Sequence, residues 1–178
     1  MIEITIDSVR ISLMTQNRVV VLRELGSRRY LPIWIGAPEA DAITLRLQNI
    51  QVDRPLTHDL LYNTITTLGA DVSYVLINEL KNDIFYAEIV LDLDEGQVRI
   101  DARPSDAIAL AVRAEVPIYV EEEVMDAAGR TPEADLSESI LLDAPREQDE
   151  PEEVKPEDMG AFADFIEGLD LDDLSEDH

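Results

Sequence analysis

Two segments of the same kind organise this sequence: RPSDAIAL at residues 103–110 and RPLTHDLL at residues 54–61. In each, an Arg-Pro pair precedes a hydroxyl residue and an acid, and an apolar run with helical spacing follows. Proline favours extended backbone in the residue before it, and a serine or threonine can accept hydrogen bonds from the free amides of a first helical turn. Both segments therefore predict the start of a capped helix.

The same two helix starts are candidate anion sites. A guanidinium group and free helix amides can converge on a phosphate or a carboxylate. The simpler interpretation is that each arginine pairs with a nearby aspartate and fixes its loop, because capping motifs are far more common than active sites. Two such starts in one small domain strengthen the case for an anion site beyond what either start supports alone. The candidate phosphate-binding residues are Arg54, Thr57, Arg103 and Ser105.

Hydrophobic periodicity predicts the elements around these segments. Strands are expected at residues 1–13, 18–25, 30–35, 70–80, 84–93, 97–101 and 117–120, with a bulge near Asp7-Ser8 where the alternation shifts phase. Helices are expected from about Pro38 to Ile50 and at residues 57–68, 105–113 and 121–128. The order predicts an α+β fold, in which helices cover a mixed, largely antiparallel sheet built from two related halves of three strands plus a helix.

Charge divides the chain into two parts. Its 178 residues have a formal net charge of −25; residues 1–130 carry 21 acids and 12 bases, whereas residues 131–178 carry 18 acids and 2 bases. We therefore expect one domain at 1–130 and an acidic tail at 131–178. Such a charge weakens the case for nucleic-acid binding through a broad basic face, leaving local basic spots around Arg18, Arg23, Arg28 and Arg29.

The tail is expected to be mostly disordered, because proline and acidic residues dominate it. Residues 158–170 form an exception. They carry Met159, Phe162, Phe165, Ile166 and Leu169 at helical spacing. This pattern predicts a short amphipathic helix that docks on the domain or binds a protein partner. The alternative is a segment without stable structure, since so short a helix is marginal in water.

Composition excludes several classes of site. The chain has no cysteine, which excludes disulfides, thiolate zinc sites and cysteine nucleophiles. Its two histidines, His58 and His178, cannot build a multi-histidine metal cage. No leader or membrane-length apolar run is present, so we expect a cytoplasmic protein with no membrane partner. The exposed strand edges of an open sheet favour a homo-oligomer, first of all a dimer.

Four blocks of the sequence resemble the bifunctional nuclease family, whose domain was formerly one of unknown function. They are LPIWIG at 31–36 followed by Glu39-Ala40, RP at 54–55 with THD at 57–59, DARPSDAIAL at 101–110, and PIYV at 117–120. The blocks occur in order, and the resemblance covers about residues 1–129. The family takes its name from members credited with both DNase and RNase activity, so the resemblance implies a hydrolase acting on DNA or RNA.

The chemistry of phosphodiester hydrolysis suggests roles for the acids near the helix starts. The reaction needs an activated water and stabilisation of phosphoryl charge, most often from Mg²⁺ or Mn²⁺ held by carboxylates. The expected metal ligands are Asp101 and Asp106, joined by Glu39 and Asp59 if the two helix starts lie together. The expected catalytic residues are Asp101, Asp106 and His58, with His58 as general base because its ordinary pKa is near neutrality.

Each of these assignments has a structural alternative. Asp101 could simply pair with Arg99 or Arg103, and His58 could be an ordinary surface residue of a first helical turn. The corresponding alternative function is a non-catalytic binding or regulatory module. Such a module would hold a small anion or a partner carboxylate at the Arg-Pro loops.

Overall fold

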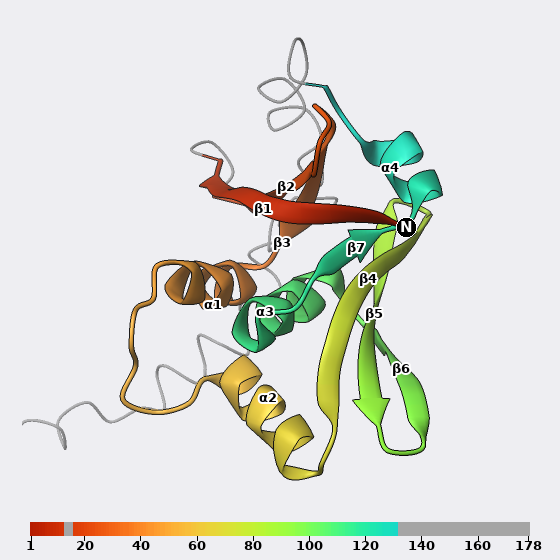
Figure 1. The fold of residues 1–178 in the computed structure, drawn as a ribbon. Coiled ribbons are helices and arrows are strands. Elements are labelled where there is room, and N and C mark those ends of the chain that lie inside the picture. The colour runs from red at the N-terminus through yellow and green to blue at the C-terminus, as the bar shows by residue number, and fades with distance from the viewer. Residues whose placement is uncertain (13–15, 132–178) are drawn as a thin grey trace, which may run out of the picture. The chain divides into compact units, whose positions relative to one another are not determined.

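The structure is a computed structural model, and it describes residues 1–12 and 16–131. Within these residues seven strands form one mixed sheet in the order β3-β2-β1-β7-β4-β5-β6 (Figure 1). The strands are β1 (Ile2–Ile11), β2 (Arg18–Glu24), β3 (Tyr30–Ile35), β4 (Asp71–Lys81), β5 (Ile84–Leu93), β6 (Gly96–Ala102) and β7 (Ile118–Val120). The helices are α1 (Ala37–Leu47), α2 (Thr57–Thr67), α3 (Pro104–Ala114) and α4 (Glu122–Ala128).

The sheet consists of two antiparallel meanders joined by one short strand. Strands β1 to β3 form the first meander and β4 to β6 the second. Between them β7 pairs antiparallel with β1 and parallel with β4. The predicted α+β fold, with a mixed and largely antiparallel sheet, is confirmed. The halves are related as expected, the first followed by two helices and the second by one.

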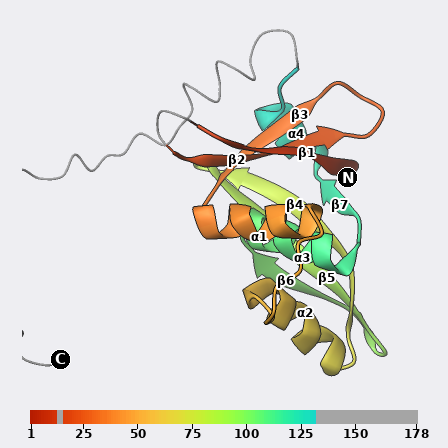
Figure 2. The same cartoon turned by 90° about the vertical axis from the view of Figure 1, so that its left-hand side faces the viewer.

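Helix α3 is the centre of the helical layer. It packs against α1, α2, β4 and β5, and residues 107–111 are almost completely buried. Figure 2 shows α1, α3 and α2 following one another down one side of the sheet. The unbroken apolar run in this helix therefore reflects burial on several sides, as expected for a helix without a solvent stripe.

Strand β1 contains the predicted bulge. Its register with β2 shifts between Ile6 and Ser8, which pair with Leu22 and Val21. Asp7 is the extra residue, and it explains why the apolar alternation of the strand changes phase at this point.

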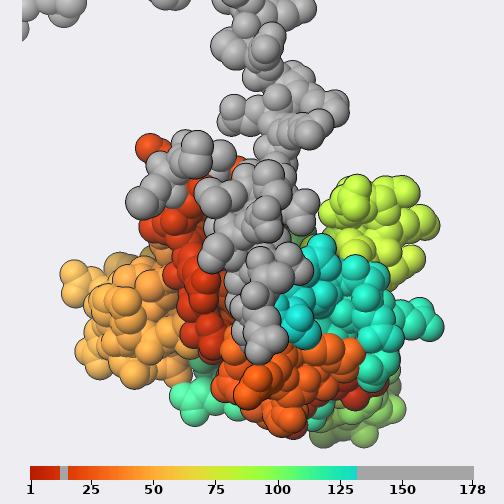
Figure 3. Space-filling view, turned by 90° about the horizontal axis from the view of Figure 1, so that it is seen from above, coloured from red at the N-terminus to blue at the C-terminus, as the bar shows by residue number. Residues whose placement is uncertain are grey.

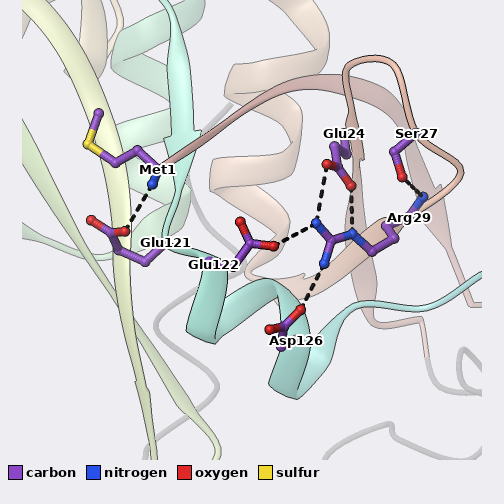
Figure 4. Close-up of polar contacts among 7 residues, drawn as sticks. All are labelled: Met1, Glu24, Ser27, Arg29, Glu121, Glu122 and Asp126. Atoms are coloured by element: carbon purple, nitrogen blue, oxygen red, sulfur yellow. Dashed lines mark hydrogen bonds and ion pairs between the residues drawn. The ribbon is translucent and has the colours of Figure 1, made fainter.

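Arg29 connects the β2–β3 hairpin to α4 (Figure 4). Its guanidinium group donates hydrogen bonds to Glu24 at 2.7 Å, to Asp126 at 2.8 Å and to Glu122 at 3.0 Å. The space-filling view of Figure 3 shows the orange atoms of this hairpin against the cyan atoms of α4. Beside it the amino group of Met1 lies 3.2 Å from Glu121. Arg29, expected as part of a basic spot, is therefore surrounded by three carboxylates.

Two further predictions from the sequence concern the acidic tail and membrane-spanning helices. Apart from Thr131, the acidic tail and the helix predicted at 158–170 lie outside the described residues. None of the helices in the described part of the chain is long and apolar enough to cross a membrane.

Candidate functional site

The first turns of α1, α2 and α3 bring four ionisable side chains together. Asp106 Oδ1 lies 3.0 Å from His58 Nε2, and Asp106 Oδ2 accepts a 2.7 Å hydrogen bond from Arg103 Nε. Arg103 Nη2 donates to Glu39 Oε1 at 2.7 Å and to Asp106 Oδ1 at 3.1 Å. We call Glu39, His58, Arg103 and Asp106 the first-turn cluster. It unites three segments that are far apart in the sequence.

The local sequence explains how α3 and α1 supply their members. Arg103 is the N-cap of α3 in extended backbone, as the following proline requires, and Asp106 lies three residues later on the same side of the first turn. On α1, the Glu39 carboxylate folds back over Gly36. A Cβ at Gly36 would clash with Glu39 Oε2, so the glycine leaves the space that this carboxylate occupies.

Asp106 holds the cluster together as a carboxylate. Its partial burial favours the neutral acid, but hydrogen bonds from Arg103 and His58 outweigh burial and lower the pKa of Asp106. With Asp106 ionised, His58 Nε2 carries the proton and donates it to Oδ1. Nδ1 of a neutral His58 then carries the lone pair, and it makes no hydrogen bond to any described residue. The arrangement is that of a histidine oriented by a carboxylate.

Arg103 is the exposed member of the cluster. Hydrogen bonds from its side chain to Asp106 and Glu39 raise the pKa of Arg103, which stays a cation. The side chain is nevertheless 67% exposed. Its Nη1 donates to no residue in the described part of the chain, because all its contacts there involve Nε and Nη2. This nitrogen can therefore meet an anion that approaches from solvent.

Asp59, expected beside Asp106, has a different environment. One carboxylate oxygen accepts a 2.8 Å hydrogen bond from the Leu56 amide and the other accepts one from Arg113. Burial opposes its ionisation, yet these two hydrogen bonds lower the pKa of Asp59. Arg113 also donates to the carbonyls of Ala109 and Ala42, so it joins the three helices from a buried position.

Arg113 was not among the predicted site residues. The available signal was a single cation within the apolar run of α3, since a buried arginine requires partners.

Asp101 lies on the other face of the sheet. Its neighbour Ala102 pairs with buried Ala87 on the helix-covered face, and successive side chains of a strand point to opposite faces. Asp101 instead lies across from Glu88. The structure thus does not bring Asp101 to the first-turn cluster, although the two are adjacent in sequence.

The remaining predicted residues flank the cluster. Arg54 is exposed and makes no hydrogen bond or ion pair with any described residue. The prediction that Thr57 and Ser105 cap the helices is wrong. The N-caps are Leu56 and Arg103, and neither of these side chains accepts a hydrogen bond from an amide of its first helical turn. Proline at the first helical position starts α3 one residue early, which places Ser105 inside the helix.

The expected metal ligands do not form a binding site in this arrangement. In residues 1–12 and 16–131, no group of three or more His, Asp or Glu side chains is placed to hold a metal ion. Asp106 and Glu39 face the Arg103 guanidinium, and Asp59 faces Arg113. In this arrangement these donors therefore do not fit a Mg²⁺ or Mn²⁺ centre. That hydrolysis needs a divalent metal ion stays a prediction.

The lowered pKa of Asp59 predicts how stability depends on pH. In the unfolded chain Asp59 titrates near 3.8, whereas in the folded chain it titrates lower. Its contribution is therefore complete above about pH 4 and is lost as pH falls through the folded value. We expect Asp59→Asn to lower the urea midpoint at pH 7, and the difference from wild type to shrink below pH 4. A difference in urea midpoint between wild type and Asp59→Asn that stays constant from pH 7 to pH 2.5 would contradict this prediction.

Comparison with known proteins places the cluster within a family domain. The family model described as the bifunctional nuclease domain matches residues 20–133, which include all four cluster residues. An uncharacterized protein of Mycobacterium tuberculosis is 36% identical over 172 residues, 97% of each chain.

Two plant proteins show the likeness over part of their length. Bifunctional nuclease 1 of Oryza sativa subsp. japonica is 30% identical over 111 residues, 61% of this chain and 34% of the plant protein. Bifunctional nuclease 2 of Arabidopsis thaliana is 28% identical over 146 residues, 74% of this chain and 44% of the plant protein. The chain thus spans less than half of either plant nuclease. From the domain match we conclude that the chain belongs to the bifunctional nuclease domain family.

Proposed function

We propose that this chain is a nuclease that hydrolyses phosphodiester bonds of DNA and RNA at the first-turn cluster. The observation that carries the proposal is the shared carboxylate of Asp106, which contacts a histidine and an exposed arginine at once. Membership of the family and the likeness to plant proteins named bifunctional nucleases support it. The cluster supplies a base and a cation, the two groups that this hydrolysis needs.

Arg103 is the phosphate-binding group in this proposal. The two N–H groups of its Nη1 meet a non-bridging oxygen and stabilise charge that develops on the phosphoryl group. Glu39 and Asp106 hold the rest of the guanidinium group in place. Arg54 is exposed on the loop before α2, and in this proposal it binds a neighbouring phosphate.

His58 is the general base. Its Nδ1 accepts a proton from the attacking water while the water oxygen forms the new bond to phosphorus, and the ester oxygen leaves with the bonding electrons. Asp106 stabilises the imidazolium that results and keeps the ring oriented. The proton on Nδ1 then passes to solvent or to the leaving oxygen.

The experiment measures cleavage of fluorescently labelled single-stranded DNA and RNA by the full chain in Mg²⁺, in Mn²⁺ and in EDTA. Arg103→Ala is expected to reduce cleavage about 10²-fold, and Arg103→Lys to retain part of it. Lys81→Ala is the matched control, because Lys81 is an exposed cation at the end of β4 and its side chain makes no hydrogen bond or ion pair with the described residues. Wild-type chain that cleaves neither substrate under any of these conditions, or equal rates for wild type and Arg103→Ala, contradicts the proposal.

One observation favours a second candidate, a non-catalytic anion-binding module. The carboxylates near the helix starts are paired with arginines and are therefore not arranged to hold a metal ion, whereas Arg103 Nη1 can still bind an anion without turnover. In that case inorganic phosphate or pyrophosphate raises the melting temperature of wild type but not of Arg103→Ala, and no nucleic acid is cleaved. Turnover of either nucleic acid excludes this candidate.

A further inference from the structure

The two edges of the sheet differ in how they are protected. On the outer side of β3, Tyr30 and Arg130 exchange two backbone hydrogen bonds of 2.7 Å. Pro32 in the same strand has no N–H to offer. At the opposite edge, no described strand pairs with the outer side of β6, and residues 96–101 are all exposed. An open edge of this kind is a template for another strand.

The open edge also exposes part of the core face. Val98 pairs with Leu91 and Ile100 pairs with Ile89. Their partners are buried, but Val98 is 46% and Ile100 is 42% exposed. Because paired residues lie on the same face of a sheet, the apolar layer under the helices continues onto β6, where its last side chains are partly exposed in the part of the chain that the structure describes.

The opposite face of β6 carries an unbalanced charge. Asp101 is directly across from Glu88, a like-charge pair that destabilises a sheet. The nearest cation on this face, Arg99, lies diagonally and forms a 2.8 Å ion pair with Glu88. Asp101 itself has no ion pair with any residue that the structure describes.

A second copy of the same strand corrects this imbalance in the register centred on Ile100, which lies within β6. In an antiparallel pair centred on Ile100, Arg99 of each copy lies across from Asp101 of the other, and Val98 lies across from Ala102. A pair centred on Arg99 or on Asp101 would instead place identical charges face to face. Registers centred between two residues would place core-face side chains opposite outer-face ones.

From these observations we infer that β6 pairs antiparallel with β6 of a second copy of this chain, about a two-fold axis at Ile100. Both copies use the same surface, as a closed dimer requires. The axis lies three residues from Arg103, so the two first-turn clusters flank the interface. The inference concerns the edge strand alone and stands whether or not the cluster cleaves nucleic acid.

Charge reversal at the interface tests this pairing. Sedimentation velocity at 150 mM salt is expected to show the full-length wild type as a dimer, twice the chain mass of 20.0 kDa. Arg99→Glu places two pairs of like charges across the axis, and association is expected to weaken at least about tenfold. Ile100→Lys places two ammonium groups at the axis and is expected to act the same way. Circular dichroism checks that both variants are folded.

Rescue distinguishes the register from a general charge effect. The double variant with Arg99→Asp and Asp101→Arg again aligns opposite charges, so the dimer is expected to return. Arg28→Glu changes net charge as much as Arg99→Glu but lies on the β2–β3 hairpin, and it is expected to leave the dimer intact. A monomeric wild type at about 100 μM overturns the inference. Folded single variants that remain dimeric, or a double variant that stays monomeric, overturn it as well.

Discussion

Replacement of Asp106 by asparagine is expected to reduce cleavage of DNA and RNA by about 10²- to 10⁴-fold. Asparagine has nearly the same volume, so the packing of the first turns is retained. It lacks the charge that orients His58 and stabilises its protonated form, and it loses the ion pair with Arg103. The effect is therefore expected on the rate of the chemical step rather than on the fold.

Single-turnover cleavage of labelled oligonucleotides measures this effect, with circular dichroism as the check on folding. Asp94→Asn removes the same charge from the exposed β5–β6 turn and is expected to leave the rate unchanged. His58→Gln should be as defective as Asp106→Asn, and the double variant little worse, because residues that act as a unit are not additive. A rate for Asp106→Asn above about a tenth of the wild-type rate contradicts the assigned role.

Arg113→Met is expected to produce the largest loss of stability, about 3 kcal/mol. The guanidinium group lies in a buried position, and its removal leaves Asp59 without a cation and the Ala42 and Ala109 carbonyls without a donor. This loss lies at the low end of the range for breaking a buried ion pair, because the Asp59 side chain is 30% exposed. Urea denaturation followed by circular dichroism measures the change.

Arg46→Met is the matched control for this experiment. Arg46 also joins α1 to α3, but its ion pair with Glu115 is exposed, and its loss should cost less than about 1 kcal/mol. The double variant Asp59→Asn, Arg113→Met is expected to lose less than the sum of the two single losses, since the unpaired carboxylate disappears. Equal losses of stability for Arg113→Met and Arg46→Met would contradict the stabilising role assigned to the buried contacts of Arg113.

The strands and helices were predictable because local signals agree with tertiary packing in this chain. Proline and glycine mark the ends of elements, and apolar alternation marks the strands. Even the bulge in β1 follows from the phase change at Asp7. The position of β7 was not predictable, because three apolar residues carry no information about which two strands they separate.

The site was predicted in part, for reasons of geometry. Asp106 is three residues after Arg103 and reaches it on the same helical turn, whereas Asp59 is five residues after Arg54 and binds Arg113 instead. The two segments look alike in sequence but differ in this spacing. Asp101 shows a second limit: adjacency in sequence does not establish which face of a sheet a side chain occupies.

The three residues of β7 have a consequence for synthesis of the chain on the ribosome. Their pairing with β1 and β4 joins the two meanders, yet these residues follow both meanders in the sequence. The nascent N-terminal meander must therefore wait, with its β1 edge unpaired, until residue 120 has left the exit tunnel. During this interval the hairpins are exposed to misassembly with neighbouring nascent chains, so slow translation before residue 118 would prolong the period of risk.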